Sequence, residues 1–295
     1  MQRNRHEMVY YENDKGGRVE IAYSFPFFFQ SLNGADGINA DITKINAAGQ
    51  DGTTITNVNL TDRQMRLHGI IKGYSKAEIE TYRKKLLQVF NPKVQGWLQY
   101  EYGDVKRKIR CQVESAPRFS ERFTGYRYQD FLIDFVCANP YWQNLNEIEQ
   151  NIATWTGLFE FPLEIPEDGI EVGMRQPSVI VNIFNAGDVE CGIKVEFKAL
   201  ATVVNPLLLN INTMEFIKIN RIMQEGEVIT VTTHFGNKRA GLEKSGVKSN
   251  AFNYIDFEST FLQLEVGDNM LRYNADDGLD NLSISIYYTP QYLGV

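Results

Sequence analysis

Short runs rich in Val, Ile, Tyr and Phe recur along this chain, and turn residues such as Gly, Asn, Asp and Pro separate them. Runs of this kind with alternating polar and apolar residues predict half-buried strands. One segment alone has the three- and four-residue spacing of an amphipathic helix. Strands must bury their apolar faces against one another, so packed sheets are the expected architecture. The sequence therefore predicts a mainly β protein with one prominent helix.

The first half is predicted to begin with a hairpin. Met8–Tyr11 and Val19–Tyr23 flank a turn rich in Asn, Asp and Gly, a composition that favours tight hairpin connections. The polar, glycine-containing stretch from Gly34 to Gly52 is interpreted as loop. The remaining strands predicted in this half are Gln64–Ile71, Gly96–Tyr102, Lys106–Glu114 and Tyr128–Cys137.

The predicted helix lies near residues 75–90. Ser75 can cap its start, and Glu78, three residues later, completes a capping box. Asn91-Pro92 ends it, because proline disfavours a helical conformation in the residue before it. The apolar residues that recur on one face are Ile79, Tyr82, Leu86 and Phe90. This single apolar face indicates packing on another element, most simply a sheet.

Two domains are expected, because 295 residues exceed one ordinary domain. Asn139-Pro140-Tyr141-Trp142 closes the first half, and glycines and prolines interrupt the chain from there to Met174. We place the domains at 1–143 and 144–295. The strands predicted in the second are Ser178–Asn185, Gly192–Leu200, Pro206–Asn210, Phe216–Ile219, Val228–Thr232, Phe261–Leu264 and Leu282–Tyr287. Turns such as Gly267-Asp268-Asn269 separate them, which indicates an all-β sandwich.

Composition argues against several classes of function. The net charge of -7 disfavours a general nucleic-acid binder, which needs a basic face to neutralise phosphates. No apolar run is long enough to cross a membrane, and the polar start, Met1–Tyr10, lacks the apolar stretch of a signal peptide. We therefore expect a protein made in the cytoplasm, with other proteins or a glycan as partners. Cys111, Cys137 and Cys191 are interpreted as buried or idle thiols.

No catalytic, cofactor or metal site is predicted. His6, His68 and His234 are far apart, and neither an HExxH motif nor a cysteine pair accompanies them. His68 is interpreted as a surface or interface residue. The chain also lacks a GxSxG elbow, a GxxxxGK phosphate loop and a dinucleotide-binding fingerprint.

Two acidic segments could each be a functional site or an ordinary surface segment. Asn274–Asn281 is similar to a calcium loop but lacks its closing Glu, so a solvated hairpin turn is favoured. Glu164, Glu167 and Asp168 offer glycosidase-like carboxylates, but an acidic β-rich protein contains such pairs by chance.

Aromatic residues are candidates for contacts with sugars or proteins. Trp155, near the domain junction, and Tyr254, in the second half, are the possible glycan contacts. Burial is the favoured interpretation for most aromatic residues of the chain, because large aromatic side chains prefer it.

A series of motifs runs from Asp62 to the C-terminal end. In the first half it comprises a strand with Arg63 and Arg66, the capped helix, Phe90-Asn91-Pro92, Trp97-Leu98-Gln99-Tyr100, the basic strand from Lys106, Glu114-Ser115-Ala116-Pro117-Arg118-Phe119 and Asn139-Pro140-Tyr141-Trp142. In the second half it comprises Asn185-Ala186-Gly187-Asp188, Asn205-Pro206, Ile217-Lys218-Ile219, Gly226-Glu227, Gly267-Asp268-Asn269 and Tyr288–Val295. In this order, the motifs resemble the siphophage distal tail protein family of phages that infect Gram-positive bacteria.

The resemblance implies a non-enzymatic structural protein of the virion tail tip, in a phage or prophage, made in the bacterial host cytoplasm. The N-terminal half would assemble into a hexameric ring, and the C-terminal half would be a sandwich similar to galectins or carbohydrate-binding modules. The ring would be a hub that joins the tail tube protein to the tail-associated lysin or tail fibre and to the receptor-binding protein.

A closed ring repeats one heterologous interface, so each subunit presents two unlike surfaces. The candidate interface residues are Arg63 and Arg66 in a strand, and Gly49, Asp51 and Gly52 in the loop Ala47–Thr56. Complementary charge is expected between Arg63, Arg66, Lys72 and Lys106–Arg110 on one side and Glu12, Asp14 and Glu20 on the other. A solvated charged strand face is the alternative for any one of these residues.

Two other functions stay open at this point. The second half could be a carbohydrate-binding module or adhesin that recognises cell-wall glycans through Trp155 or Tyr254. A glycoside hydrolase on a β-sandwich ranks behind it, because it needs two carboxylates across a cleft.

Overall fold

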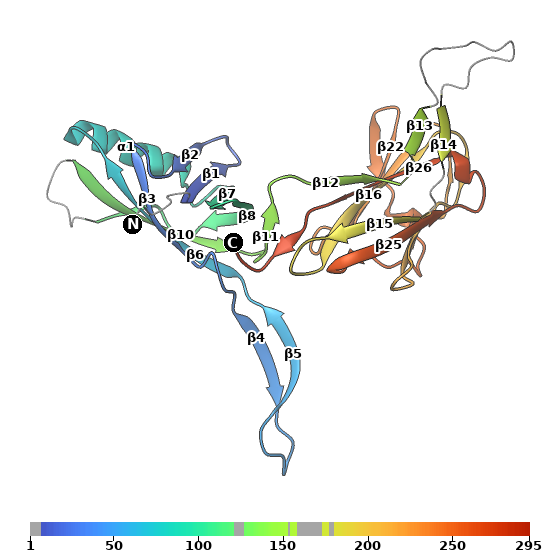
Figure 1. Ribbon diagram of the computed structural model, residues 1–295, viewed down its shortest axis with the longest axis horizontal. Coiled ribbons are helices and arrows are strands. Elements are labelled where there is room, and N and C mark those ends of the chain that lie inside the picture. Colours follow the sequence, from blue (N-terminus) through green and yellow to red (C-terminus); the bar gives the residue numbers. More distant parts are fainter. Residues whose placement is uncertain (1–6, 121–126, 153, 158–172, 177–179) are drawn as a thin grey trace. The chain divides into compact units, whose positions relative to one another are not determined.

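The computed structural model describes residues 7–120, 127–152, 154–157, 173–176 and 180–295. Strands dominate, and one α-helix is present among the described residues, so the predicted fold class is confirmed (Figure 1). The chain divides into two compact units. Unit 1 comprises residues 1–145 and 291–295, and unit 2 comprises residues 146–290. The last five residues, which the sequence analysis placed in the second domain, therefore belong to unit 1.

Unit 1 is built on a ten-stranded antiparallel sheet. The main path through it is β2 (Arg18–Ile21), β1 (Glu7–Asn13), β7 (Gln95–Tyr102), β8 (Val105–Val113), β10 (Tyr128–Cys137), β6 (Arg63–Lys72) and β3 (Phe27–Asn33). The shorter β9 (Arg118–Phe119), β11 (Trp142–Asn144) and β27 (Gln291–Tyr292) join it. Bridges from Ala22 and Tyr23 to Phe28 connect the end of β2 with β3, so the sheet curls towards closure around its core.

Alternation along the strands of unit 1 separates a buried face from an outer face. In β6, Met65, Leu67 and Ile71 point into the core, and the residues between them are more exposed. Gly69 shares the inner face, where a Cβ would lie 2.4 Å from the ring of Phe131 on β10. Glycine at this position therefore makes room for the aromatic ring, and the strand predicted at Gln64–Ile71 is confirmed.

The helix α1 (Lys76–Val89) begins where the sequence predicts. The Ser75 hydroxyl accepts a hydrogen bond from the Glu78 amide at 3.3 Å, and the Glu78 carboxylate accepts one from the Tyr74 amide at 2.9 Å. The apolar face buries Ile79, Leu86 and Val89 in the core of unit 1. Phe90 follows the last turn and stacks on Tyr11 of β1, with ring centroids 4.6 Å apart. The helix thus packs on the sheet, as its single apolar face requires.

Unit 2 contains two sheets that enclose a single core. The larger has the main path β12 (Ile148–Asn151), β26 (Leu282–Tyr288), β16 (Cys191–Ala199), β21 (Val228–Thr232), β22 (Arg239–Lys244) and β23 (Val247–Asn250), and β24 (Gln263–Leu264) pairs with β16. The smaller is β15 (Ile180–Asn185), β25 (Gly267–Asn274), β18 (Leu207–Asn210) and β19 (Phe216–Lys218). Inward residues of both sheets, such as Phe197 and Leu271, form one buried cluster, so unit 2 is a β-sandwich.

The remaining elements of unit 2 are small. They are β13 (Thr154–Gly157) paired with β14 (Gly173–Gln176), β17 (Val203–Val204) paired with β20 (Ile222–Met223), and the 3-10 turns η1 (Phe252–Tyr254) and η2 (Leu279–Asn281). The predicted turn Gly267-Asp268-Asn269 is wrong, since these residues begin β25. Leu271 and Tyr273 of this strand are buried, and they alternate with the exposed Met270, Arg272 and Asn274 on its outer face.

The described residues contain no helix that is long and apolar enough to span a bilayer. Cys111, Cys137 and Cys191 are buried free thiols, as expected.

Candidate functional site

Residues 40–60 form a two-stranded hairpin, which we call the arm (Figure 1). β4 (Ala40–Ile45) and β5 (Thr54–Leu60) run antiparallel, with Ile42 opposite Val58. Within the described part of the chain these two strands pair only with each other. Leu60 is half-buried, and all other residues of both strands are exposed. An isolated hairpin has marginal stability in water, so the arm needs contacts beyond its own strands.

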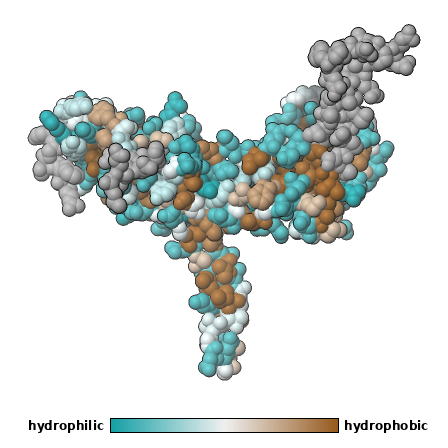
Figure 2. Space-filling model, in the orientation of Figure 1, coloured by the Kyte–Doolittle hydropathy of each residue, from teal (hydrophilic) through white to brown (hydrophobic). Residues whose placement is uncertain are grey.

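The arm carries aliphatic side chains that are open to water in the single chain. Ile42, Ile45, Ile55 and Val58 are 42%, 56%, 57% and 54% exposed. Figure 2 shows the corresponding hydrophobic surface along the arm. β-branched residues suit strands, but none of these side chains is buried by the described residues around it. Exposed aliphatic side chains gathered on one element are typical of a protein-interaction site.

Three predicted interface residues, Gly49, Asp51 and Gly52, lie together at the tip of the arm. Gly49 and Gly52 have φ values of 83° and 84°, in the left-handed region, and a Cβ on either would meet no atom within 4 Å. The two glycines therefore serve the turn and not the packing. The interpretation of residues 34–52 as loop is corrected, since β4 lies within this segment.

Arg63, which the sequence analysis proposed for the interface, is buried within unit 1. Its side chain points into unit 1 and the residue is 2% exposed. The guanidinium donates hydrogen bonds to the carbonyls of Pro140 at 2.8 Å, Gly34 at 2.8 Å and Leu293 at 2.6 Å. Burial lowers the pKa of Arg63 below its ordinary value. The arginine satisfies carbonyls of three separate chain segments, so its role is to hold the base of the arm and the C-terminal segment in place.

Arg66, on the opposite face of the same strand, has an exposed side chain. It donates a hydrogen bond to the Asp134 carboxylate at 2.6 Å, and Arg118 contacts the other oxygen of Asp134. The hydrogen bond that Arg66 donates to Asp134 raises the pKa of Arg66. A polar depression of about 270 Å³ lies here, lined in part by Gln64 and Glu114. The predicted site is thus a charged surface feature of unit 1 whose central carboxylate is already paired.

The expected charge complementarity between subunits is partly satisfied inside unit 1. Asp14, at the end of β1, accepts a hydrogen bond from Arg110 of β8 at 2.7 Å. This hydrogen bond lowers the pKa of the Asp14 carboxyl. Lys106 likewise pairs with Glu101 on the neighbouring strand at 2.9 Å. These cations have partners within the chain, so the apolar arm is a better candidate for an interface than the basic strand.

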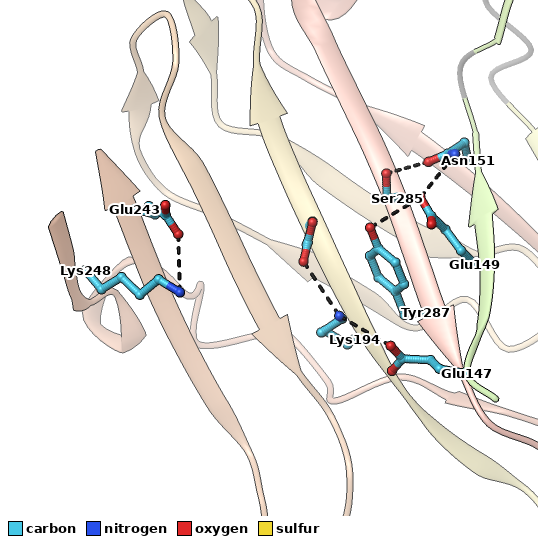
Figure 3. Close-up of polar contacts among 9 residues, drawn as sticks. Glu147, Glu149, Asn151, Lys194, Glu243, Lys248, Ser285 and Tyr287 are labelled. Atoms are coloured by element: carbon cyan, nitrogen blue, oxygen red, sulfur yellow. Dashed lines mark hydrogen bonds and ion pairs between the residues drawn. The ribbon is translucent and has the colours of Figure 1, made fainter. Parts of the chain in front are cut away.

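Unit 2 presents two outer faces of opposite character. On the four-stranded sheet, Phe184 and Met270 are 58% and 42% exposed, with Leu209 and Phe216 half-buried beside them. We call these four residues the apolar face. The outer face of the larger sheet is polar and hydroxyl-rich (Figure 3), and it contains a groove of about 480 Å³. Sequence periodicity could have found both faces, because residues two apart in a strand share a face.

Of the two aromatic residues proposed for glycan contact, the structure describes the side chain of Tyr254 alone. Trp155 lies in β13, opposite Arg175 of β14, and its side chain is outside the described part of the structure. Tyr254 is half-buried against the core of unit 2, and the Arg221 guanidinium lies 4.6 Å from its ring centroid. One ring face of Tyr254 is therefore already covered by a cation.

The described residues contain no group of three or more His, Cys, Asp or Glu side chains that could hold a metal ion. His68 lies 3.9 Å from Asp130, and burial lowers the pKa of His234. His6 and the carboxylates Glu164, Glu167 and Asp168 lie outside the described residues. In the calcium-like segment, Asp276 accepts a hydrogen bond from Asn205 at 2.8 Å, which lowers the pKa of its carboxyl.

Comparison with known families accounts for both units. Residues 15–137 match the family described as the phage tail protein RIFT-related domain, and residues 186–292 match the siphovirus-type tail component, C-terminal domain. The chain belongs to the siphophage distal tail protein family. A search of curated protein sequences gives no match for this distal tail protein.

Solved structures share its fold. The SPP1 Dit protein, described as a paradigm of the hub adsorption apparatus in Gram-positive-infecting phages, superposes with a TM-score of 0.69 at 12% identity. The match covers 97% of this distal tail protein and 99% of that chain. A chain of the phage P2 baseplate in its activated conformation with Ca gives a TM-score of 0.52, also at 12% identity, with 98% and 99% coverage. The family matches make the distal tail protein a component of a siphovirus-type tail, and the solved structures show that it shares the fold of these tail proteins.

Proposed function

We propose that copies of the distal tail protein assemble through unit 1 into a closed hexameric ring at the tail tip. The observation that carries this proposal is the arm, whose aliphatic side chains stay exposed although the two strands pair with each other. Association with a neighbouring copy would remove this surface from water, which is the main favourable term in most protein assembly.

A ring needs a second surface that is unlike the first, because its interface is heterologous. Unit 1 offers an aromatic cluster beside the start of α1. Phe25 and Tyr74 are 44% and 71% exposed and stack with ring centroids 5.5 Å apart, and Tyr82 packs edge-on against Phe25. Aromatic residues are enriched in the buried centres of interfaces. We therefore pair the arm of one copy with the aromatic cluster of the next.

The ring would act as a hub between other tail proteins. On one side it would meet the tail tube protein, and on the other the tail-associated lysin or tail fibre and the receptor-binding protein. The apolar face of unit 2 supports this assignment, because an exposed apolar sheet face is a suitable docking surface for a further protein. The role needs no cofactor and no chemical step.

The arm is tested by the double substitution Ile42→Asp with Val58→Asp. Light scattering of the purified wild-type chain is expected to give six times the chain mass of 33.8 kDa, and the variant is expected to run as a monomer. Val247→Asp is the matched control, since Val247 is 69% exposed in the edge strand β23 of unit 2. A ring that survives both aspartates would contradict the role of the arm, and so would equal loss of the ring in the control.

A further inference from the structure

The groove on unit 2 lies across four neighbouring strands of the larger sheet. Cross-strand pairing places Glu196 of β16 opposite Thr230 of β21, and Thr230 opposite Gly241 of β22. Partners in an antiparallel sheet share a face, so these three residues form one row across the strands. Strands about 4.8 Å apart give the four-strand groove a width of about 14 Å. Longer side chains, including Lys194, Glu243 and Lys248, stand on either side of the row.

Gly241 keeps the row open. Its φ is outside the left-handed region, and a Cβ built on it would meet only the Ser249 carbonyl, at 3.8 Å. Neither backbone conformation nor packing therefore requires glycine here, although glycine weakens a strand interior. Its local effect is to leave space on the sheet surface for a ligand to approach the backbone.

The charges that line the groove balance. Lys194 and Lys248 face Glu196 and Glu243, and they pair with them at 3.7 Å and 3.5 Å (Figure 3). A charged polymer of either sign would be repelled by two of the four charged side chains and attracted by the other two. A neutral ligand with hydroxyl groups can donate to the carboxylates and accept from the ammonium groups, and the Thr230 hydroxyl can do both.

The lining also disfavours a protein partner. Lys and Glu supply half of the eight lining residues, whereas the buried centre of a protein interface is depleted in both. Val228 and Leu242 are the large aliphatic residues of the lining, and Leu242 is only 8% exposed. An added strand could not pair in the groove either, because β16, β21 and β22 already have neighbours on both sides.

The polar surface continues beyond the groove on the side of β26 and β12. Tyr287 donates a hydrogen bond to Glu149 at 3.3 Å, and the Ser285 hydroxyl donates one to the side-chain oxygen of Asn151 (Figure 3). The Lys194 ammonium lies 3.8 Å from the Tyr287 ring centroid, so it is held in place by an aromatic ring as well as by carboxylates. Fixed donors and acceptors of this kind can select among the stereoisomers of a polyhydroxylated ligand.

We propose that this groove binds a neutral oligosaccharide, with Glu196, Thr230 and Glu243 as hydroxyl-binding residues and Gly241 as the open floor. The site lies on the sheet face and is separate in sequence from Trp155 and Tyr254. It does not depend on ring formation.

The test is binding of the full chain to an array of neutral oligosaccharides of glucose, galactose, mannose and N-acetylglucosamine, with sulfated and phosphorylated glycans alongside. Neutral glycans are expected to be retained, and titration calorimetry with the best of them should show at least a tenfold loss of affinity in Gly241→Trp. Asn274→Trp, at an exposed strand position of the other sheet, is the matched control and should bind as the wild type does.

Equal thermal unfolding of the two tryptophan variants shows that the groove, and not the fold, was altered. Retention of no neutral glycan, retention of the anionic glycans alone, or unchanged affinity in Gly241→Trp would each overturn the proposal. Glu243→Gln is the second variant if the tryptophan perturbs folding, and it should weaken binding of the same glycan at least threefold.

Discussion

Arg63 donates a hydrogen bond from its Nη2 to the main-chain carbonyl of Leu293, 230 residues further along the chain, at 2.6 Å. Its other nitrogens donate hydrogen bonds to the carbonyls of Gly34, which follows β3, and of Pro140, which lies between β10 and β11. A single buried cation thus joins three distant segments of unit 1. Guanidinium suits this task, because its fixed fork of donors can satisfy several carbonyls at once.

Substitution of this arginine should destabilise unit 1. Arg63→Ala leaves several buried carbonyls without donors, and we expect a loss of about 3 kcal/mol in the free energy of unfolding. Arg66→Ala, on the exposed face of the same strand, should cost less than about 1 kcal/mol. Urea unfolding of both variants measures the difference. Equal losses would contradict the assigned role of Arg63.

Glu227 should make unit 2 sensitive to acid. It is buried and bonded by Arg221 and Lys244, each at 3.1 Å. Burial alone would raise its pKa, but the hydrogen bonds from Arg221, the Gln224 amide and Lys244 outweigh this and place the pKa below the ordinary 4.5. Because the folded-state pKa is the lower one, the stabilisation is present above about pH 4.5 and is lost as the pH falls through the folded-state value.

Glu227→Gln is therefore expected to lower the free energy of unfolding by about 2 kcal/mol at pH 7 and to reduce the pH dependence below pH 4.5. Thermal unfolding from pH 3 to pH 7 provides the measurement, with the exposed Glu225→Gln as control. An unchanged acid profile in Glu227→Gln would show that other groups govern it.

The cysteines should be unreactive in the folded protein. A hydrogen bond with Cys137 and burial raise the pKa of Cys111 well above its ordinary value, and burial raises the pKa of Cys191 to about 12. The thiolate is the reactive form, so a raised pKa slows alkylation. Iodoacetamide at pH 8 should leave all three thiols unmodified in the native chain and modify all three in urea, as read by mass spectrometry. Rapid labelling of the native chain would contradict this burial.

Capping residues and residue alternation in the sequence predicted the helix and the strands that depend on neighbouring residues. The Ser75 and Glu78 pair located the start of the helix, and alternation located β6 with its inner and outer faces. The arm was missed because glycine and polar residues outweighed a real alternation, in which Ile42 and Val58 are separated from their neighbours by polar residues.

The candidate sites depend on contacts between distant residues, which explains why the sequence indicated them less well. Arg63 and Arg66 are alike in sequence, yet one side chain is buried and the other is on the surface. Alternation alone places Arg63 on the inner face and Arg66 on the outer face, but it does not reveal the carbonyls of Gly34, Pro140 and Leu293 that accept hydrogen bonds from Arg63. The groove in unit 2 likewise needs the register of β16, β21 and β22 before Glu196, Thr230 and Gly241 form a row.

We propose that this tail protein functions as a ring of identical subunits. The most direct measurement is electron microscopy of the purified full-length chain, with rotational averaging of the particles and a mass measured on the same sample. An annulus with sixfold symmetry and six times the chain mass is the predicted result. Particles with the 33.8 kDa mass of a single chain at every concentration, with no annulus, would contradict the account.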